Sequence, residues 1–307
     1  MTAHVVILGG GGQLGSAVSK PQVWPDTYRV TRLTRHELDV TNAAALEAMF
    51  KTLSPIDWVI NAAGFLPVDR AQAHPQEALR VNGLALFDIA SACKAHGAKL
   101  LHVSTDHVFD GKKDQPYKED DPTNPLNIYG CSKRIGELIL ASLDIPHIVL
   151  RTAWLYGVTG NTFVQKVWAW SKEKRTVSIV DDQLGCPTHV EDVARGIATM
   201  ITSQVDRPNP ETLGTFHFCG AQKTSWHGFG TAILEAIQRE QGAPSPLTLL
   251  PTSTAAFREQ NPSVAPRPLD GALDCKRIQQ SYGIQPVGYG EQLSNVVRLM
   301  LNPFVTH

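Results

Sequence analysis

The sequence predicts an α/β protein with a Rossmann-like, doubly wound parallel sheet and a smaller C-terminal domain. Three observations predict this class. Short apolar runs alternate with helical patterns in the first half, a glycine-rich turn follows the first run, and the pattern changes after about residue 150. Short strands that alternate with helices form parallel sheets with helices on both faces.

Five short runs of apolar and β-branched residues predict the strands of this sheet. Helical spacing of apolar residues between these runs predicts the helices that connect them. The predicted strands cover 5–8, 28–33, 58–62, 99–104 and 147–152, and the predicted helices cover 42–53, 75–96 and 132–143.

In the second half, helical patterns are separated by loops rich in Pro, Thr and Gly. Helices are predicted over 163–174, 190–201 and 228–239, surface loops over 206–214 and 242–267, and a strand that returns to the sheet over 214–219. We therefore expect a larger domain over 1–155, with a returning segment at about 189–220, and a smaller domain over 156–188 and 221–307.

Composition excludes several classes of function. The 307 residues include 28 Lys and Arg against 29 Asp and Glu, so the formal net charge is -1. Binders of nucleic acid or anionic membranes carry a basic excess, and we expect neither partner. The five cysteines form no Cys-x-x-Cys pair, which predicts neither a disulfide framework nor a metal site. With no signal-peptide pattern and no long apolar run, we expect a soluble, cytoplasmic protein.

A glycine-rich turn follows the first predicted strand and opens a helix. Its sequence is Gly-Gly-Gly-Gly-Gln-Leu-Gly over residues 9–15, with Gly9, Gly12 and Gly15 in the spacing of a dinucleotide-binding turn. Glycines allow a tight turn and let the backbone approach a pyrophosphate, and the helix N-terminus favours that anion. The turn therefore predicts that the larger domain binds a dinucleotide, although glycine-rich turns also occur without ligands.

The second predicted strand indicates which dinucleotide is bound. An NAD site usually places an acidic residue about 20 residues after the glycines, where it accepts from the ribose 2′-hydroxyl. This chain has Thr-Arg-Leu-Thr-Arg-His at 31–36. Arg35, or alternatively Arg32, can pair with a 2′-phosphate, so we expect NADP(H), with NAD(H) as the alternative.

A tyrosine and a lysine lie four residues apart in the helix that follows the fourth strand. At this spacing, Tyr129 and Lys133 share one helical face. A nearby ammonium is expected to lower the phenol pKa from about 10, which suits a general acid for a carbonyl that is being reduced. Ser104 and Thr105 end the fourth strand and could bond the same carbonyl oxygen, although such hydroxyls also close ordinary turns.

These residues resemble the extended short-chain dehydrogenase/reductases, and within that superfamily the dTDP-4-dehydrorhamnose reductase family. The resemblance runs from the first strand to Arg267. The matching segments are 9–15, 61–64, 68–71, 81–82, 104–111, 120–130, 151–157 and 181–188.

The resemblance implies the reduction of the 4-keto group of a nucleotide-linked 6-deoxy-hexulose, with dTDP-L-rhamnose as the product. Tyr129 would donate the proton, Lys133 would tune it and anchor the cofactor, and Thr105 would orient the carbonyl. The implied cofactor contacts are Gly9, Gly12, Gln13, Leu14, Gly15, Arg35, Asp39, Asn61, Ala62, Ala63, Ser104, Tyr129 and Lys133. The implied substrate contacts are Asp106, His107, Asn127, Trp154, Gln183, Thr188 and Arg267.

Two positions depart from the family pattern. The family usually has tyrosine where this chain has His107, which either packs or changes the sugar preference. The family usually has Asn-Ser after the proline that follows Arg267, whereas Asp270 introduces a negative charge beside the expected diphosphate.

Several alternatives remain open. A sugar-nucleotide 4,6-dehydratase needs Thr-Asp-Glu at the end of the fourth strand, and this chain has Thr105-Asp106-His107 instead. A reductase of a different keto-sugar nucleotide is a further alternative. The non-catalytic regulatory subunit of methionine adenosyltransferase also resembles this family and binds NADP, so a binding module is the second functional class. A homodimer is possible.

Overall fold

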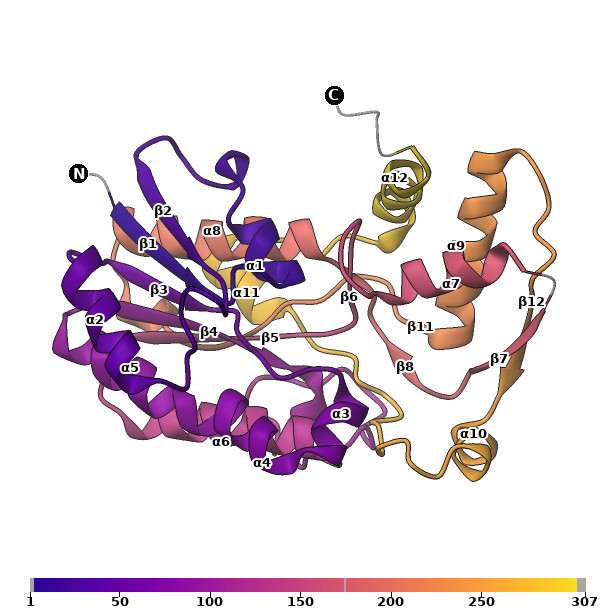
Figure 1. The fold of residues 1–307 in the computed structure, drawn as a ribbon, viewed down its shortest axis with the longest axis horizontal. Helices are drawn as coiled ribbons and strands as arrows, with labels where there is room; N and C mark the ends of the chain where they lie inside the picture. Colours follow the sequence, from indigo (N-terminus) through magenta and orange to yellow (C-terminus); the bar gives the residue numbers. More distant parts are fainter. Residues whose placement is uncertain (1–2, 174, 303–307) are drawn as a thin grey trace.

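The computed structural model describes residues 3–173 and 175–302, and its centre is a six-stranded sheet (Figure 1). All neighbouring strands are parallel, in the order β10-β5-β4-β3-β1-β2. The strands are β1 Ala3–Leu8, β2 Tyr28–Leu33, β3 Trp58–Asn61, β4 Lys99–Thr105, β5 His147–Thr152 and β10 Gly214–His217. The predicted fold class is confirmed, and β10 is the returning strand that the sequence predicted.

Helices cover both faces of this sheet because successive strand residues point to opposite faces. Val5 and Ile7 pack in the core beneath one helical layer, and Val6 and Leu8 pack beneath the other. The first layer consists of α1 Gln13–Val18, α8 Val190–Asp206 and α11 Lys276–Tyr282, and the second of α2 Ala43–Leu53, α5 Ala85–Ala95 and α6 Ile128–Ser142 (Figure 1).

The strand order reverses at β1, and this reversal positions the site. The chain passes from β1 to β2 on one side and then crosses back to β3 on the other side. In doubly wound sheets the crevice at the carboxyl ends of such strands binds ligands. The loops after β1 and β3 touch closely: a Cβ on Gly9, whose φ is +79°, would lie 2.5 Å from the backbone nitrogen of Ala63.

A smaller unit with its own core lies beside the carboxyl edge of the sheet (Figure 1). Its core side chains come mainly from α7, α9 and α12. The unit contains α7 Phe163–Ser171, β7 Thr176–Val180, α9 Trp226–Gln241, β12 Thr248–Thr252, α10 Thr254–Gln260 and α12 Tyr289–Leu301, with β7 and β12 paired in parallel. Two short strand pairs complete the fold: β6 Leu155–Tyr156 pairs in parallel with β9 Thr188–His189, and β8 Leu184–Gly185 pairs antiparallel with β11 Thr224–Ser225.

The remaining elements are short. They are α3 Val68–Ala73, α4 Pro75–Ala78, a π-helical turn η2 Leu79–Leu84, and the 3-10 turns η1 Pro21–Val23, η3 Asp106–Val108 and η4 Pro210–Thr212. No helix within the described ranges is long and apolar enough to cross a membrane.

Several sequence boundaries differ from the structure. The predicted loop 242–267 contains β12 and α10, and the predicted helix 75–96 is divided into α4, η2 and α5. The helix predicted over 163–174 ends at Ser171, and residue 174 lies outside the described residues. Helical spacing alone predicts 132–143, but α6 begins at Ile128 with the Asn127 side chain as its N-cap, so Tyr129 lies in this helix as expected.

The placement of 221–307 wholly in the smaller unit is also wrong for one segment. Ile278 of α11 is buried in the core of the main sheet, and Tyr282 packs edge-on against Phe216 of β10 with ring centroids 5.3 Å apart. The rest of the domain division stays a prediction. Residues 1–2, 174 and 303–307, which it includes, lie outside the described residues.

Candidate active site

A cavity of about 740 Å³ lies at the carboxyl ends of the central strands. Its wall is formed by the glycine turn, the segments after β2 and β3, the ends of β4 and β5, the first turns of α6, and Trp226 of α9. Of the site residues expected from the sequence, the wall contains Gly9, Gly12, Gln13, Leu14, Arg35, Asp39, Ala62, Ala63, Ser104, Thr105, Asp106, His107, Tyr129, Lys133 and Trp154. Outside it lie Gly15, Asn61, Asn127, Gln183, Thr188 and Arg267.

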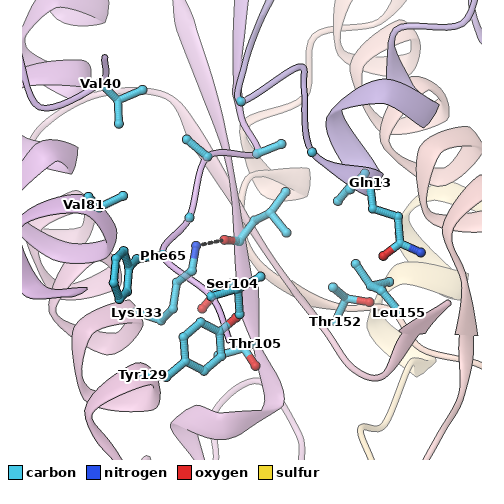
Figure 2. Close-up of a pocket in the computed structure, with 18 of the residues that line it drawn as sticks. Gln13, Val40, Phe65, Val81, Ser104, Thr105, Tyr129, Lys133, Thr152 and Leu155 are labelled. Atoms are coloured by element: carbon cyan, nitrogen blue, oxygen red, sulfur yellow. Dashed lines mark hydrogen bonds between the residues drawn. The ribbon is translucent and has the colours of Figure 1, made fainter. Parts of the chain in front are cut away.

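The glycine turn has the shape and the donors that an anionic group needs. Gly15 is behind the turn, where a Cβ would lie 2.3 Å from the Gly9 carbonyl oxygen, so it packs α1 against the turn and does not face the cavity. Gln13 faces the cavity from the opposite side to Tyr129 (Figure 2). Its Nε2 atom is buried and has no hydrogen-bond partner within residues 3–173 and 175–302. An unpaired buried donor beside a glycine cradle fits the pyrophosphate of a dinucleotide.

The segment after β2 places one basic and one acidic side chain on the cavity wall. Arg35 lies on the wall with its side chain 67% exposed, 3.9 Å from Glu77 Oε1. Asp39 also lies there, and the pKa of its carboxyl group is lowered, first by hydrogen bonds from Thr41 and then by the Arg35 charge. Arg32 instead packs across the glycine turn, where a Cβ on Gly10 would lie 2.3 Å from its Cγ. Arg35 is therefore the better placed of the two arginines for a 2′-phosphate.

We predict that Arg35→Ala weakens NADPH binding by about 10- to 100-fold, the effect of one charge-assisted hydrogen bond, and leaves NADH binding nearly unchanged. Fluorescence titration with each cofactor measures the two dissociation constants. Arg32→Ala is the matched control and should not change the ratio. Equal losses of NADPH and NADH in Arg35→Ala would reject the assignment to the 2′-phosphate.

Tyr129 and Lys133 are positioned by the first two turns of α6. The helix lies so close to η3 that a Cβ on Gly130 would be 2.1 Å from the His107 carbonyl oxygen. Lys133 Nζ donates a 2.9 Å hydrogen bond to the Val103 carbonyl of β4 (Figure 2). Burial lowers the pKa of Lys133 to about 8, and the Glu137 charge works against that shift.

The expected lowering of the Tyr129 pKa by Lys133 is not what the structure shows. The pKa of Tyr129 is raised, mainly because the ring is buried, with the Asp106 charge adding to the rise and the Thr105 hydroxyl opposing it. The Lys133 ammonium is directed at the Val103 carbonyl and does not offset this burial. The phenol therefore stays protonated at neutral pH, which is the state that a proton donor needs.

The two hydroxyls at the end of β4 already donate to carboxylates. Ser104 Oγ donates to Glu137 Oε1 at 2.6 Å, and Thr105 Oγ1 donates to Asp106 Oδ1 at 2.9 Å. Asp106 is 4% exposed, and burial raises the pKa of its carboxyl group. The sequence expected Ser104 or Thr105 to donate to the substrate carbonyl, and the structure gives both protons another acceptor.

Two predicted contacts support the wall from behind. Asn61 is buried, receives the Ala63 backbone N–H at 3.1 Å and lies 3.2 Å from His102 Nδ1, so it shapes the loop after β3. Asn127 is the N-cap of α6 and receives the Gly130 backbone N–H at 2.9 Å. Both side chains bond to the protein itself and lie outside the cavity wall, and their contacts with the cofactor and the substrate stay predictions.

Three further residues that were predicted to contact the substrate also form hydrogen bonds or ion pairs within the protein. Thr188 Oγ1 donates to the Cys186 carbonyl at 2.9 Å, and Gln183 Nε2 donates to Thr254 Oγ1 at 3.0 Å. Arg267 forms a 2.8 Å ion pair with Asp69 and donates to the Ala265 carbonyl, and its contact with a diphosphate stays a prediction.

Asp270, which departs from the family pattern, does not line the cavity. Its carboxylate forms a 2.8 Å ion pair with Lys223 and receives the Ala272 backbone N–H. Its negative charge is therefore balanced locally and is not presented to a diphosphate.

The sequence missed an aromatic part of the wall. Trp226, the first residue of α9, stacks on Trp154 with ring centroids 3.7 Å apart and planes 13° apart. Trp154 has φ of 46°, the one positive value outside glycine in the described residues, and such backbone strain is typical of functional sites. Trp226 carries no local signal, since only the fold brings it to Trp154.

Thr152 and Phe65 were also missed. Thr152 Oγ1 is buried without a partner in the described part of the chain and lies across the cavity from Tyr129 (Figure 2). Phe65 is held by Asn82 of η2, which accepts its backbone N–H at 2.7 Å and donates to Ser132 of α6. A polar residue at the end of β5, where the neighbouring strands carry site residues, is the signal that could have indicated Thr152.

Comparison with known proteins identifies the family. The family model described as the RmlD substrate binding domain matches residues 3–302. A dTDP-4-dehydrorhamnose reductase of Aggregatibacter actinomycetemcomitans is 36% identical over 96% of this chain and 98% of its own. This chain belongs to the dTDP-4-dehydrorhamnose reductase family. The resemblance seen in the sequence is thus confirmed.

Solved structures of dTDP-4-dehydrorhamnose reductases have the same fold. That of Clostridium acetobutylicum ATCC 824 superimposes with a TM-score of 0.85 at 30% identity, covering 97% of this chain and 99% of the other. That of Bacillus anthracis str. Ames, described as a complex with NADP, has a TM-score of 0.83 at 27% identity, covering 98% and 99%. No group of three or more His, Cys, Asp or Glu residues that could hold a metal ion occurs in the described ranges.

Proposed function

We propose that this protein reduces the 4-keto group of dTDP-4-dehydrorhamnose with NADPH, which yields dTDP-L-rhamnose. The observation that carries the proposal is that Tyr129 and Lys133, one helical turn apart on α6, face the same cavity as the glycine turn (Figure 2). The proposal is supported by relatives of that name that match nearly the whole chain.

The cofactor, when bound, supplies the hydride for the carbonyl carbon. The protein supplies the proton and the geometry. The Tyr129 phenol, kept protonated by burial, donates to the carbonyl oxygen as negative charge develops there. Lys133 is held in place by Val103 and is protonated at neutral pH, and it can orient the ribose and the phenol. Phe65 and Val81 on the wall exclude water from the reacting atoms.

The test is direct. The purified chain is mixed with NADPH and dTDP-4-dehydrorhamnose, the loss of NADPH absorbance is followed, and the product is identified by mass spectrometry. NADPH-dependent formation of dTDP-L-rhamnose supports the proposal. Tight NADPH binding without oxidation by any 4-keto-6-deoxy sugar nucleotide would instead favour a binding module. Oxidation only with another sugar nucleotide would keep the chemistry and change the substrate.

The assembly and compartment belong to the same proposal. We propose a cytoplasmic enzyme, in keeping with five free cysteines and with a substrate that is a charged nucleotide sugar. A homodimer stays a prediction, which size-exclusion chromatography with light scattering would test. We expect neither nucleic acid nor membrane as a partner, because the net charge is close to zero.

A further inference from the structure

His107 lies on the cavity wall, directly after Thr105 and Asp106. Its ring meets the ring of Tyr129 edge-on, with centroids 5.5 Å apart and planes 75° apart. The side chain is therefore next to the group that we propose as the proton donor.

The Asn127 amide has only one orientation that satisfies its neighbours. Its Oδ1 atom accepts the Gly130 backbone N–H at 2.9 Å, and its Nδ2 atom donates to the Pro266 carbonyl at 2.8 Å. A flipped amide would place two acceptors together and two donors together. The atom that lies 3.0 Å from His107 Nδ1 is thus Nδ2, which can only donate.

This contact fixes the proton of the imidazole. Nδ1 accepts from Asn127, so a neutral His107 carries its hydrogen on Nε2. Burial and the Arg267 charge favour the neutral ring, whereas the charges of Asp106 and Asp69 favour the protonated one. The balance lowers the pKa of His107 below its usual value, and the ring is neutral at pH 7.

The neighbouring hydroxyls of Ser104 and Thr105 already donate their protons to other side chains. Ser104 donates its proton to Glu137, and Thr105 donates its proton to Asp106. Thr105 Oγ1 also accepts the His107 backbone N–H at 3.2 Å. His107 lines the cavity, and the hydrogen bond that its side chain makes with the described residues is the one at Nδ1 with Asn127, so Nε2–H is available to a bound ligand.

We propose that His107 is a specificity-determining residue, whose Nε2–H donates to an oxygen of the hexose beside the carbonyl that Tyr129 protonates. The inference rests on the proposed function and refines the substrate that it selects. A tyrosine at this place can donate or accept, whereas this imidazole can only donate, because its other nitrogen is occupied by Asn127. The site therefore favours a hexose that carries an oxygen at this position over the corresponding deoxy sugar.

Two variants of His107 distinguish the contribution of Nδ1 from that of Nε2. Asparagine places an amide near the position of Nδ1 and lacks the distal donor, whereas glutamine places an N–H near the position of Nε2. We expect His107→Asn to lower kcat/KM for the sugar nucleotide by about 10- to 100-fold, mainly through KM, and His107→Gln to retain most of it. NADPH affinity should stay the same in both. Equal activity of His107→Asn and the unmodified chain would overturn the proposal, as would equal losses in both variants.

A binding experiment keeps this test independent of turnover. Calorimetric titration of the NADP⁺-loaded protein with dTDP-L-rhamnose should show the same order of affinities: the unmodified chain, then His107→Gln, then His107→Asn. If the unmodified chain binds this ligand but oxidises no NADPH, the proposed function fails and the role of His107 is still decided by this order. Unchanged affinity in His107→Asn would reject the role.

The tautomer has its own spectroscopic signature. In a sample labelled with ¹⁵N-histidine, the His107 signals, assigned by their loss in His107→Gln, should show a hydrogen on Nε2 and none on Nδ1 at neutral pH. A hydrogen on Nδ1, or a doubly protonated ring, would overturn the inference.

Discussion

Replacing Tyr129 with phenylalanine is expected to lower turnover by about two to four orders of magnitude, the range seen when a general acid is removed. The change removes only the phenolic hydroxyl. The ring keeps its contact with His107 and its place in the small core cluster with Phe65, Ala71 and Ala78. The dissociation constant of NADPH should hardly change. Single-turnover measurement of NADPH oxidation, with a parallel binding titration, separates these two effects.

Tyr156→Phe provides the matched control. Tyr156 is also buried, at 1% exposure, but it lies outside the cavity wall, and its hydroxyl contacts the Tyr289 carbonyl at 3.4 Å. Its loss should leave turnover close to that of the unmodified chain. Full activity of Tyr129→Phe would show that another group donates the proton, and equal losses in both variants would indicate a general effect on folding.

The sheet and the reacting end of the cavity could be predicted because they depend on local patterns. Each central strand is a short apolar run, and the four-residue spacing of Tyr129 and Lys133 places both side chains on one helical face. The ends of parallel strands meet at one edge of the sheet, so Thr105 and the glycine turn had to be neighbours in the folded chain.

The remaining features depend on contacts between distant segments, which local patterns do not contain. The proline-rich stretch that includes Thr248–Thr252 forms β12 only because β7 lies beside it. Asn127 has the composition of a substrate contact, yet it caps its own helix and bonds to Pro266 from the far end of the chain. The pKa of Tyr129 depends on burial, which spacing alone cannot give.

Beneath the reacting groups, α6 carries a third residue of the same face. Glu137 is 3% exposed and receives hydrogen bonds from Ser104 Oγ at 2.6 Å and from Arg151 Nε and Nη2 at 2.9 and 2.8 Å. Arg134 adds a hydrogen bond at 3.0 Å. The Arg151 side chain is also 3% exposed, so the pair is shielded from water and joins α6 to β4 and β5.

Glu137→Gln is expected to lower the free energy of unfolding by about 3–5 kcal/mol, because it leaves the Arg151 charge buried without a counter-ion. Urea unfolding followed by circular dichroism measures this loss. Arg134→Ala is the surface control and should cost about 1 kcal/mol or less, since its side chain is 30% exposed.

A double variant distinguishes loss of a partner from loss of the pair itself. Glu137→Leu combined with Arg151→Met leaves no buried charge, so it should be more stable than Glu137→Leu alone. If the single and double variants lose the same free energy, packing at Glu137, and not the charge of Arg151, stabilises this part of the fold.

Glu137→Gln is also expected to change the pH dependence of cofactor binding. The Glu137 charge raises the pKa of Lys133, so its loss should move the alkaline limit of NADPH binding to lower pH.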